Sequence, residues 1–195
     1  MVAGSSEADT GPIGPGRLVL VVGPSGAGKD SVIIGLRAAL ESRGERGFVF
    51  PSRIVTRSAH AAEANASLSE DDFEKGLAAG TFALSWRAHG LAYAIPATIN
   101  DSIRGGHTVV INTSRAVVSA ARTRYANATV MLVDAPIAVR AERLAARGRE
   151  TRAEIEARLA RAVSAFDPGN ADVVIDNSGR LDDAVSRALS YLIAT

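Results

Sequence analysis

The stretch Arg17-Leu-Val-Leu-Val-Val22-Gly23-Pro-Ser-Gly-Ala-Gly-Lys29-Asp30-Ser31 decides the fold of this chain. Its first part, 17–22, is a short apolar run between glycines, which is the pattern of a strand buried on both faces. Residues 29–43 place apolar side chains at helical spacing, and Gly44 ends that pattern. Between strand and helix lies Gly-x-x-x-x-Gly-Lys, the signature of a phosphate-binding loop (P-loop), in the context that this loop requires.

The loop is predicted to hold the phosphates of ATP. Its glycines let the backbone wrap around phosphate, and the helix N-terminus supplies N–H groups with a partial positive charge. Lys29, one of only two lysines in the chain, would reach the β- and γ-phosphates as a compact cation. A glycine-rich turn without a ligand is the alternative. The predicted cofactor-binding residues are Gly23, Pro24, Ser25, Gly26, Ala27, Gly28, Lys29, Asp30 and Ser31.

The residue after the lysine departs from the usual motif. A Ser or Thr normally stands there and binds Mg²⁺ through its hydroxyl, whereas this chain has Asp30, followed by Ser31. A carboxylate is a hard oxygen ligand that suits Mg²⁺, directly or through water. We therefore expect Asp30 to contact Mg²⁺, with a solvated helix N-cap as the alternative.

Strand and helix patterns alternate along the rest of the chain. Further strands are expected at 48–55, 108–111, 129–133 and 172–175, and helices at 69–79, 114–125, 136–147, 151–165 and 181–193. The stretch 56–97 is less regular apart from its helix. The alternation predicts an α/β protein of the P-loop NTPase fold, with a parallel sheet and helices on both faces.

Length and composition limit the possible organisation and partners. A chain of 195 residues suits one domain, predicted over 17–195, after a flexible tail at 1–16 that lacks the pattern of a secretory signal. The net charge of +1 gives no case for nucleic acid or membrane partners. The absence of cysteine excludes disulfides and fits a reducing cytoplasm. We expect a cytoplasmic monomer or homodimer with a small-molecule substrate.

Segments beyond the loop resemble the guanylate kinase family. Residues 52–57 are similar to that family's strand ending in Thr-Arg, and 73–82 and 86–96 to its monophosphate-binding insert. The resemblance implies an acceptor-binding insert at about 56–97 and a lid at about 140–152. The guanine-reading positions, however, are Leu84 and Ile95. Guanine is a poor fit, because a site that binds a base loses affinity when its polar partners are missing.

Five motifs resemble the ribose 1,5-bisphosphate phosphokinase family, guanylate-kinase-like enzymes of bacterial phosphonate catabolism. The resemblance implies transfer of the γ-phosphoryl group of ATP to the 1-phosphate of ribose 1,5-bisphosphate, giving 5-phosphoribosyl 1-diphosphate (PRPP) and ADP. A guanylate or other nucleoside-monophosphate kinase and a non-catalytic guanylate-kinase-like binding module are the alternatives. The intact loop disfavours the module. The motifs span 23–31, 53–57, 84–91, 112–115 and 147–150, the last leading into 154–159.

A sugar bisphosphate calls for cations and hydroxyls in its site. Arg53 and Arg57 have an even spacing that can point both to one face of a strand, and guanidinium groups bind phosphate bidentately. Arg115 follows a buried strand, at the edge where ligands bind in open α/β sheets. Surface charge or packing is the alternative for each residue. With the motif matches, the predicted acceptor residues are Arg53, Arg57, Tyr93, Asn112, Ser114 and Arg115.

Arginines also gather in the segment 140–152. Arg140, Arg143 and Arg147 fall at i, i+3 and i+7, on one face of a helix. In nucleoside-monophosphate kinases such a segment is a lid that closes over ATP, and phosphoryl transfer depends on positioning and charge stabilisation. A solvated basic helix is the alternative. The predicted catalytic residues are Lys29, Arg143, Arg147 and Arg149.

Two further polar positions follow predicted strands. Asp134 would either hold Mg²⁺ through water or cap the helix that starts at Pro136. Asp176 and Asn177 follow the last strand, near the place where related kinases hold adenine. No general base is required, because a phosphate-oxygen nucleophile is already ionised at neutral pH.

Overall fold

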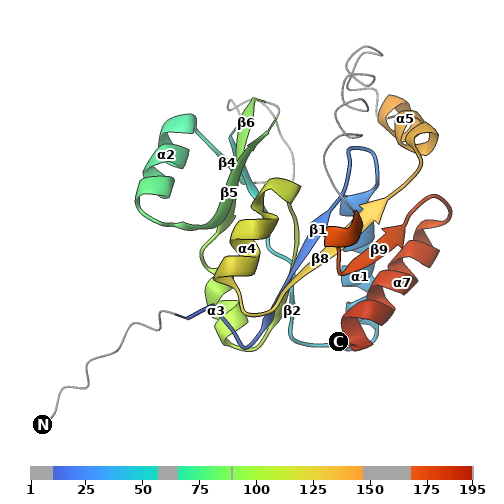
Figure 1. Ribbon diagram of the computed structural model, residues 1–195, viewed down its shortest axis with the longest axis horizontal. Coiled ribbons are helices and arrows are strands. Elements are labelled where there is room, and N and C mark those ends of the chain that lie inside the picture. Colours follow the sequence, from blue (N-terminus) through green and yellow to red (C-terminus); the bar gives the residue numbers. More distant parts are fainter. Residues whose placement is uncertain (1–10, 57–65, 89, 147–167, 195) are drawn as a thin grey trace, which may run out of the picture.

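The chain forms two β-sheets (Figure 1). The structure is a computed structural model that describes residues 11–56, 66–88, 90–146 and 168–194. The five-stranded sheet has the order β2-β7-β1-β8-β9, and all of its strand pairs are parallel. Its strands are β1 (Arg17–Val22), β2 (Phe48–Val49), β7 (Thr108–Asn112), β8 (Ala128–Asp134) and β9 (Val173–Asp176). The predicted α/β class with a parallel sheet is confirmed.

Strand β1 lies at the centre of this sheet, and residues 18–22 are fully buried. Leu18, Leu20 and Val22 face one core cluster, whereas Val19 and Val21 face the other. Burial of both faces explains why the strand is a continuous apolar run with no polar alternation. Each fully buried Val or Leu side chain contributes about 1.5–3 kcal/mol relative to an exposed one.

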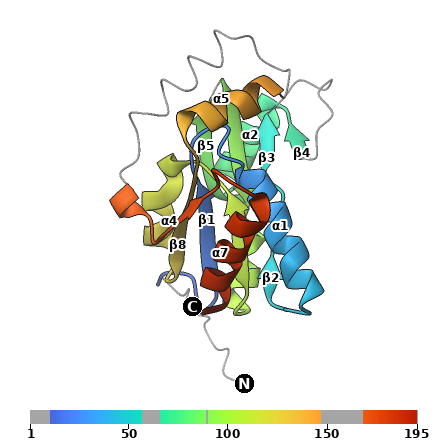
Figure 2. The same cartoon turned by 90° about the vertical axis from the view of Figure 1, so that its right-hand side faces the viewer.

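Helices cover the two faces of the five-stranded sheet. One cluster packs against α3 (Ile99–Arg104) and α4 (Val118–Arg124), and the other against α1 (Lys29–Ser42) and α7 (Leu181–Ala194). Helices α1 and α7 lie side by side (Figure 2). A Cβ atom added at Gly35 would lie 2.5 Å from a Val185 methyl carbon, so glycine permits this close approach.

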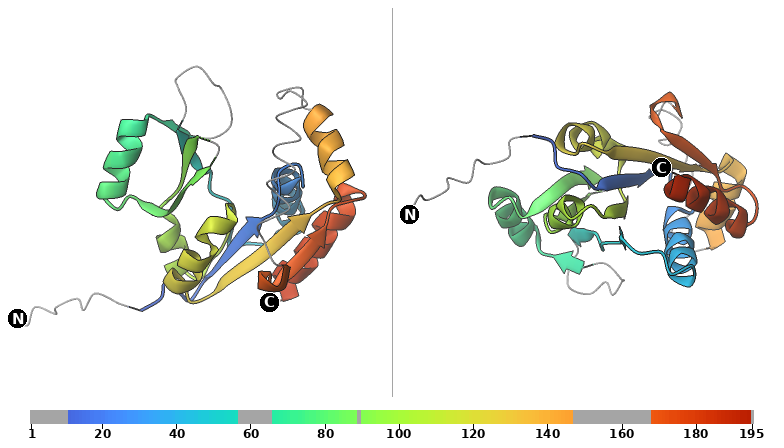
Figure 3. Two further views of the ribbon diagram at one scale, coloured as in Figure 1. Left: turned by 45° about the horizontal axis from the view of Figure 1, so that its top comes forward. Right: turned by 90° about the horizontal axis from the view of Figure 1, so that it is seen from below.

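The four-stranded sheet lies to one side of the five-stranded sheet, with α2 (Glu70–Ala78) packed on it (Figure 3). Ser69 caps α2, because its hydroxyl accepts a hydrogen bond from the Asp72 N–H at 3.1 Å. Phe73 of α2 is the largest side chain in the small buried cluster of this region. The strand order is β4-β3-β6-β5, with bounds β3 (Ile54–Thr56), β4 (Ala66–Leu68), β5 (Phe82–Ala88) and β6 (Leu91–Pro96).

Three predictions about secondary structure were wrong in detail. The single strand expected at 48–55 is two short strands in different sheets, and Pro51 between them has no N–H to donate to a ladder. The helix expected at 114–125 begins as a 3₁₀ turn, Arg115–Val117, before α4. The irregular stretch 56–97 contains three strands of a sheet that was not predicted. The helix expected at 151–165 lies outside the described residues.

The segment 11–16, expected to belong to a flexible tail, is attached to the domain. Ile13 forms a parallel bridge with Tyr125, and its N–H donates to the Arg124 carbonyl at 2.8 Å. The Asn127 side chain donates to the Pro15 carbonyl at 2.8 Å. The tail prediction therefore does not hold for these residues, and 1–10 lie outside the described part of the chain.

Among the described residues, no helix combines the length and the apolar composition that crossing a bilayer would need.

Candidate active site

The loop between β1 and α1 is tightly packed against its surroundings. Gly23 lies so close to β8 that an added Cβ would be 2.0 Å from the Val133 carbonyl oxygen. Gly28 has a φ of +89°, and a Cβ there would lie 2.4 Å from the Asn177 side-chain nitrogen. Both positions require glycine because of their neighbours, and Gly28 also because of its left-handed backbone.

Lys29 begins α1 and folds back over the loop. Its Nζ donates to the Gly23 carbonyl at 2.8 Å and to the Pro24 carbonyl at 3.1 Å. Helix α1 has no side-chain cap at Gly28, so its N-cap residue does not compete with a ligand for the amides of the first turn. The ammonium group and the helix N-terminus thus provide positive charge at one point, as a phosphate chain requires.

Asn177 holds the loop from the neighbouring strand and is 2% exposed. Its Nδ2 donates to the Ala27 carbonyl at 2.7 Å, and its backbone N–H donates to the Asp134 carbonyl at 2.8 Å. Its Oδ1 is buried and has no hydrogen-bond partner in the described part of the chain. The sequence placed Asn177 near adenine and missed this contact with the loop. The only hint was its position directly after the last strand.

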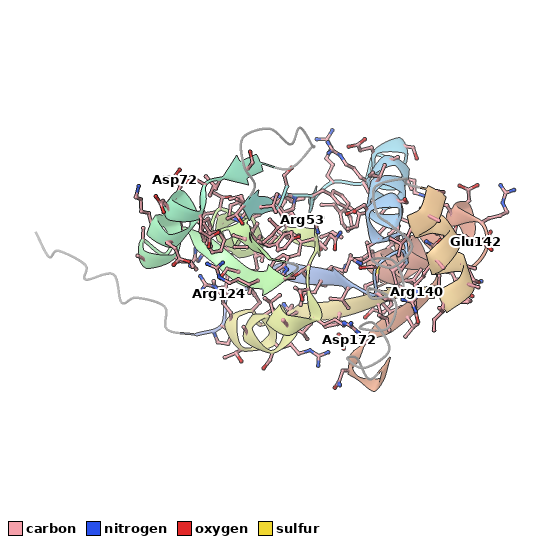
Figure 4. The ribbon with its side chains drawn as sticks, turned by 90° about the horizontal axis from the view of Figure 1, so that it is seen from above. Arg53, Asp72, Arg124, Arg140, Glu142 and Asp172 are labelled. Atoms are coloured by element: carbon pink, nitrogen blue, oxygen red, sulfur yellow. The ribbon has the colours of Figure 1, made fainter. Side chains whose placement is uncertain are left out.

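Helix α5 (Ile137–Ala146) brings two arginines to the loop. Arg140 is 5% exposed, and its Nε donates to the Ala135 carbonyl at 3.0 Å. A Cβ added at Gly26 would lie 2.8 Å from the Arg140 carbonyl oxygen, so the backbone of α5 rests on the loop. Arg140 therefore has a structural contact that the sequence did not reveal. Figure 4 looks down on this end of the molecule, with Arg140 beside α5 and Arg53 toward the four-stranded sheet.

Arg143, predicted as catalytic, lies beside the start of α1. Its Nη1 is 3.7 Å from the position of a Cβ added at Gly28, and this atom is buried without a hydrogen-bond partner among the described residues. The structure thus brings Arg143 to the same end of the loop as Lys29. Arg147 and Arg149, the other predicted lid arginines, lie outside the described residues.

Asp30, the predicted metal ligand, is hydrogen-bonded to Asn112, a predicted acceptor residue. The Asn112 Nδ2 donates to the Asp30 Oδ1 at 2.5 Å, across 82 positions of sequence. Within the described ranges, no group of three or more His, Cys, Asp and Glu side chains could hold a metal. In kinase sites Mg²⁺ is bound through one or two carboxylates together with the substrate phosphates. The exposed Asp30 carboxylate at the loop fits such an ion.

Arg115 and Ser114 follow β7 on the α4 side of the molecule. Burial lowers the pKa of the Arg115 guanidinium, the charge of Asp134 opposes this shift, and the charge of Arg140 adds to it. The Asp134 Oδ1 accepts a hydrogen bond from the Ala135 N–H at 2.8 Å. An open cavity of about 740 Å³ is lined by Ser114, Arg115, Ala116, Val118, Ser119, Arg122, Thr123 and Asn170.

Tyr93 and Arg53, two of the predicted acceptor residues, meet at the four-stranded sheet. The Arg53 guanidinium carbon is 5.6 Å from the Tyr93 ring centroid, which is a cation–π distance. Tyr93 also stacks on Trp86, its partner across the β5–β6 pair, with 5.3 Å between ring centroids and 8° between ring planes. Leu84 and Ile95 pair across β5 and β6, and both are buried. Arg57 lies outside the described residues.

Solved structures share this fold. Guanylate kinase from Anaplasma phagocytophilum superposes with a TM-score of 0.67 at 16% identity, covering 94% of this chain and 87% of that chain. A sugar kinase from Janibacter sp. HTCC2649 superposes with a TM-score of 0.53 at 20% identity, covering 92% and 95%. Such identities show the fold alone. Together with the loop geometry, they define a P-loop protein with the guanylate-kinase-like fold.

Sequence relatives narrow the class. No family model matches the chain. Ribose 1,5-bisphosphate phosphokinase PhnN of Bradyrhizobium diazoefficiens is 48% identical over 181 residues, covering 93% of this chain and 90% of the relative. The protein of the same name from Rhodopseudomonas palustris is 50% identical over 187 residues, covering 96% and 92%. The chain belongs to the ribose 1,5-bisphosphate phosphokinase family.

Proposed function

We propose that this kinase transfers the γ-phosphoryl group of ATP to the 1-phosphate of ribose 1,5-bisphosphate, giving PRPP and ADP, in bacterial phosphonate catabolism. Its family membership supports this reaction. The observation that carries the choice of acceptor is the buried, apolar pair of Leu84 and Ile95 at the positions that read guanine in guanylate kinases. A base would find no polar partner from either side chain.

In this reaction an oxygen of the acceptor's 1-phosphate forms a bond to the γ-phosphorus. The bond between the γ-phosphorus and the β–γ bridging oxygen breaks, and ADP leaves with that electron pair. The attacking oxygen is already ionised at neutral pH, so no side chain has to remove a proton. The protein's task is to position two polyanions and to stabilise their charge.

On the nucleotide side, residues 23–31 would hold the triphosphate. The Lys29 ammonium would exchange its contacts with the Gly23 and Pro24 carbonyls for phosphate oxygens. Asp30, together with the phosphates, would hold Mg²⁺, which when bound neutralises phosphate charge. A catalytic role for Arg143 is supported by its buried guanidinium nitrogen, which has no hydrogen-bond partner among the described residues and would be strongly attracted to developing negative charge. We assign Arg147 and Arg149 to the same task on the lid, 140–152.

On the acceptor side, the insert 56–97 would present its cations to the sugar bisphosphate. Arg53 and Arg57 would bind phosphate oxygens, and the Tyr93 hydroxyl would donate to one of them. Because Arg53 lies over the Tyr93 ring, the two side chains hold one another in place. Ser114 and Arg115 would contact the acceptor from the end of β7. We place the reaction in the cytoplasm.

The test is a coupled ADP-release assay with a panel of acceptors. Ribose 1,5-bisphosphate, ribose 5-phosphate, GMP and AMP are each supplied with ATP and Mg²⁺. We expect ADP release with ribose 1,5-bisphosphate only, and a new diphosphate in the phosphorus NMR spectrum of the product. Turnover of GMP without turnover of the sugar bisphosphate would refute the proposal.

A further inference from the structure

The hydrogen bond between Asp30 and Asn112 joins a residue predicted to bind Mg²⁺ and nucleotide to one predicted to bind the acceptor. Asp30 is the second residue of α1, and Asn112 is the last residue of β7. The 2.5 Å hydrogen bond has an amide N–H as donor and a carboxylate as acceptor, so it is charge-assisted. We infer that Asn112 is a positioning residue, which orients the Asp30 carboxylate toward the metal–phosphate group of a bound nucleotide. The inference rests on the proposed nucleotide site.

The backbone around Asn112 is held firmly. Asn112 pairs with Val21 in the central strand, and the Thr113 N–H donates to the Val21 carbonyl at 3.1 Å. The Asn112 Oδ1 is itself buried. A side chain on such a strand end has little freedom, so it can impose its orientation on a partner.

Asp30, in contrast, is exposed. It follows the left-handed Gly28 by two residues, at a helix start that has no side-chain cap. An exposed carboxylate in this place would exchange among rotamers and among water contacts. The Asn112 amide selects one orientation by engaging Oδ1, and within the described ranges no other residue donates to the second carboxylate oxygen.

The chemistry of the two groups explains why they occur together. The hydroxyl that usually follows the loop lysine is both a donor and an acceptor, whereas an ionised carboxylate can only accept. A carboxylate at position 30 therefore needs a donor from elsewhere to fix its plane, and Asn112 supplies it. Partners that orient a metal ligand in this way typically change metal affinity by about 10–100-fold when removed.

The Asn112 Oδ1 has no hydrogen-bond partner within the described residues. A buried acceptor without a partner is unfavourable, and rotating the amide would bring its oxygen against the Asp30 carboxylate. The amide orientation is therefore dictated by Asp30. This arrangement is expected if the role of Asn112 is to orient Asp30.

The experiment measures binding of the non-hydrolysable analogue AMP-PNP by calorimetry, with and without Mg²⁺ and in the absence of any acceptor. For Asn112→Ala we expect about 10-fold weaker binding in Mg²⁺ and a change of less than about two-fold without Mg²⁺. Asp30→Asn should lose the same Mg²⁺-dependent gain, and adding Asn112→Ala to it should cost nothing more, because the two residues act as one unit. Asn112→Ser serves if the alanine variant does not fold.

The exchange variant Asp30→Asn/Asn112→Asp separates positioning from a structural link between α1 and β7. It restores a donor–acceptor pair with reversed polarity, so thermal unfolding should return toward the wild-type temperature while the Mg²⁺-dependent gain stays lost. Recovery of that gain would overturn the inference. So would an Asn112→Ala variant that keeps its Mg²⁺ dependence and changes only the acceptor KM.

Asn127→Ala is the matched control, since Asn127 also donates a side-chain hydrogen bond, to the Pro15 carbonyl, before β8 begins. It should leave both AMP-PNP affinities unchanged. Because no acceptor enters these titrations, their outcome does not depend on the acceptor panel. A protein that fails to phosphorylate ribose 1,5-bisphosphate can still show the Mg²⁺ linkage.

Discussion

The five-stranded and four-stranded sheets differ in how their functional side chains are supported. The phosphate loop follows a strand whose residues 18–22 are fully buried between two large clusters. Tyr93 lies in the four-stranded sheet, and Arg53 directly precedes its strand β3. One face of this sheet joins a large cluster through Ala83, Leu84 and Ile95, but the face toward α2 has only the small cluster of Phe73, Ala92 and Ala94. Few buried apolar contacts mean a low free energy of local opening. We therefore expect the proposed nucleotide side to be the rigid half of the site, and the α2 side of the four-stranded sheet to open more easily.

The largest expected effect is a loss of turnover from a change in the rigid half that leaves its fold intact. Lys29→Ala removes the ammonium group that contacts the Gly23 and Pro24 carbonyls. We expect kcat to fall about 10³-fold, the upper range for loss of one charge-stabilising group, with little change in the unfolding temperature. Lys75→Ala is the control, because Lys75 is an exposed residue paired with Asp72 on α2. Near wild-type turnover by Lys29→Ala would remove the loop lysine from the mechanism.

The next prediction concerns the stability of the four-stranded sheet and α2. Phe73→Ala deletes the largest side chain of the small cluster between α2 and the four-stranded sheet, and such a change costs about 3 kcal/mol. Hydrogen exchange should accelerate in β3 to β6, and the acceptor KM should rise, while AMP-PNP affinity stays the same. Leu77→Ala, at an exposed site on the same helix, should do neither. Equal protection loss in β1 and β8 would show that the two sheets open as one unit.

A glycine pair sharpens the account of the loop. Gly28 and Gly44 both have positive φ values, +89° and +69°, but only Gly28 has neighbours that a Cβ would meet. Gly44→Ala should cost about 1 kcal/mol from backbone strain alone. Gly28→Ala should cost about 1–2 kcal/mol more, because it displaces Asn177 and its hydrogen bond to Ala27. Denaturant unfolding measures both costs, and equal values would mean that Asn177 does not hold the loop.

The smallest effect concerns acid stability in the two regions. The Ser69 hydroxyl and then the charge of Lys75 lower the pKa of Asp72 near the four-stranded sheet. The Ser178 hydroxyl and N–H lower the pKa of Asp176 beside the phosphate loop. A carboxyl whose pKa is lowered in the folded state stabilises the fold fully at pH values above its unfolded-state pKa. This stabilisation is lost as the pH falls through the folded-state pKa.

Asp72→Asn and Asp176→Asn should therefore be slightly less stable than the wild type at pH 7, and the difference should begin to shrink near pH 4 and disappear as the pH falls through the folded-state pKa of each carboxyl. Unfolding free energies measured from pH 7 to pH 3 test this. A difference as large at pH 3 as at pH 7 would mean that the carboxylate charge is not its cause.

Sequence patterns predicted the two regions unequally. The P-loop, its strand and its helix are contiguous, so one motif of local spacing defines them. In the second sheet, β3 and β4 have only three residues each, too few for periodicity to show. The contacts between Asn177 and Ala27 and between Asn112 and Asp30 span 150 and 82 positions. Only the strand order brings those residues together.

The starts of α1 and α2 show what the loop leaves to its ligand. Helix α2 is completed by its own Ser69 hydroxyl, whereas α1 starts at a glycine that has no side chain to offer. A phosphate group bound there would do for α1 what serine does for α2. The substrate then becomes part of the secondary structure, and the protein's melting temperature becomes a direct gauge of how much nucleotide surrounds it.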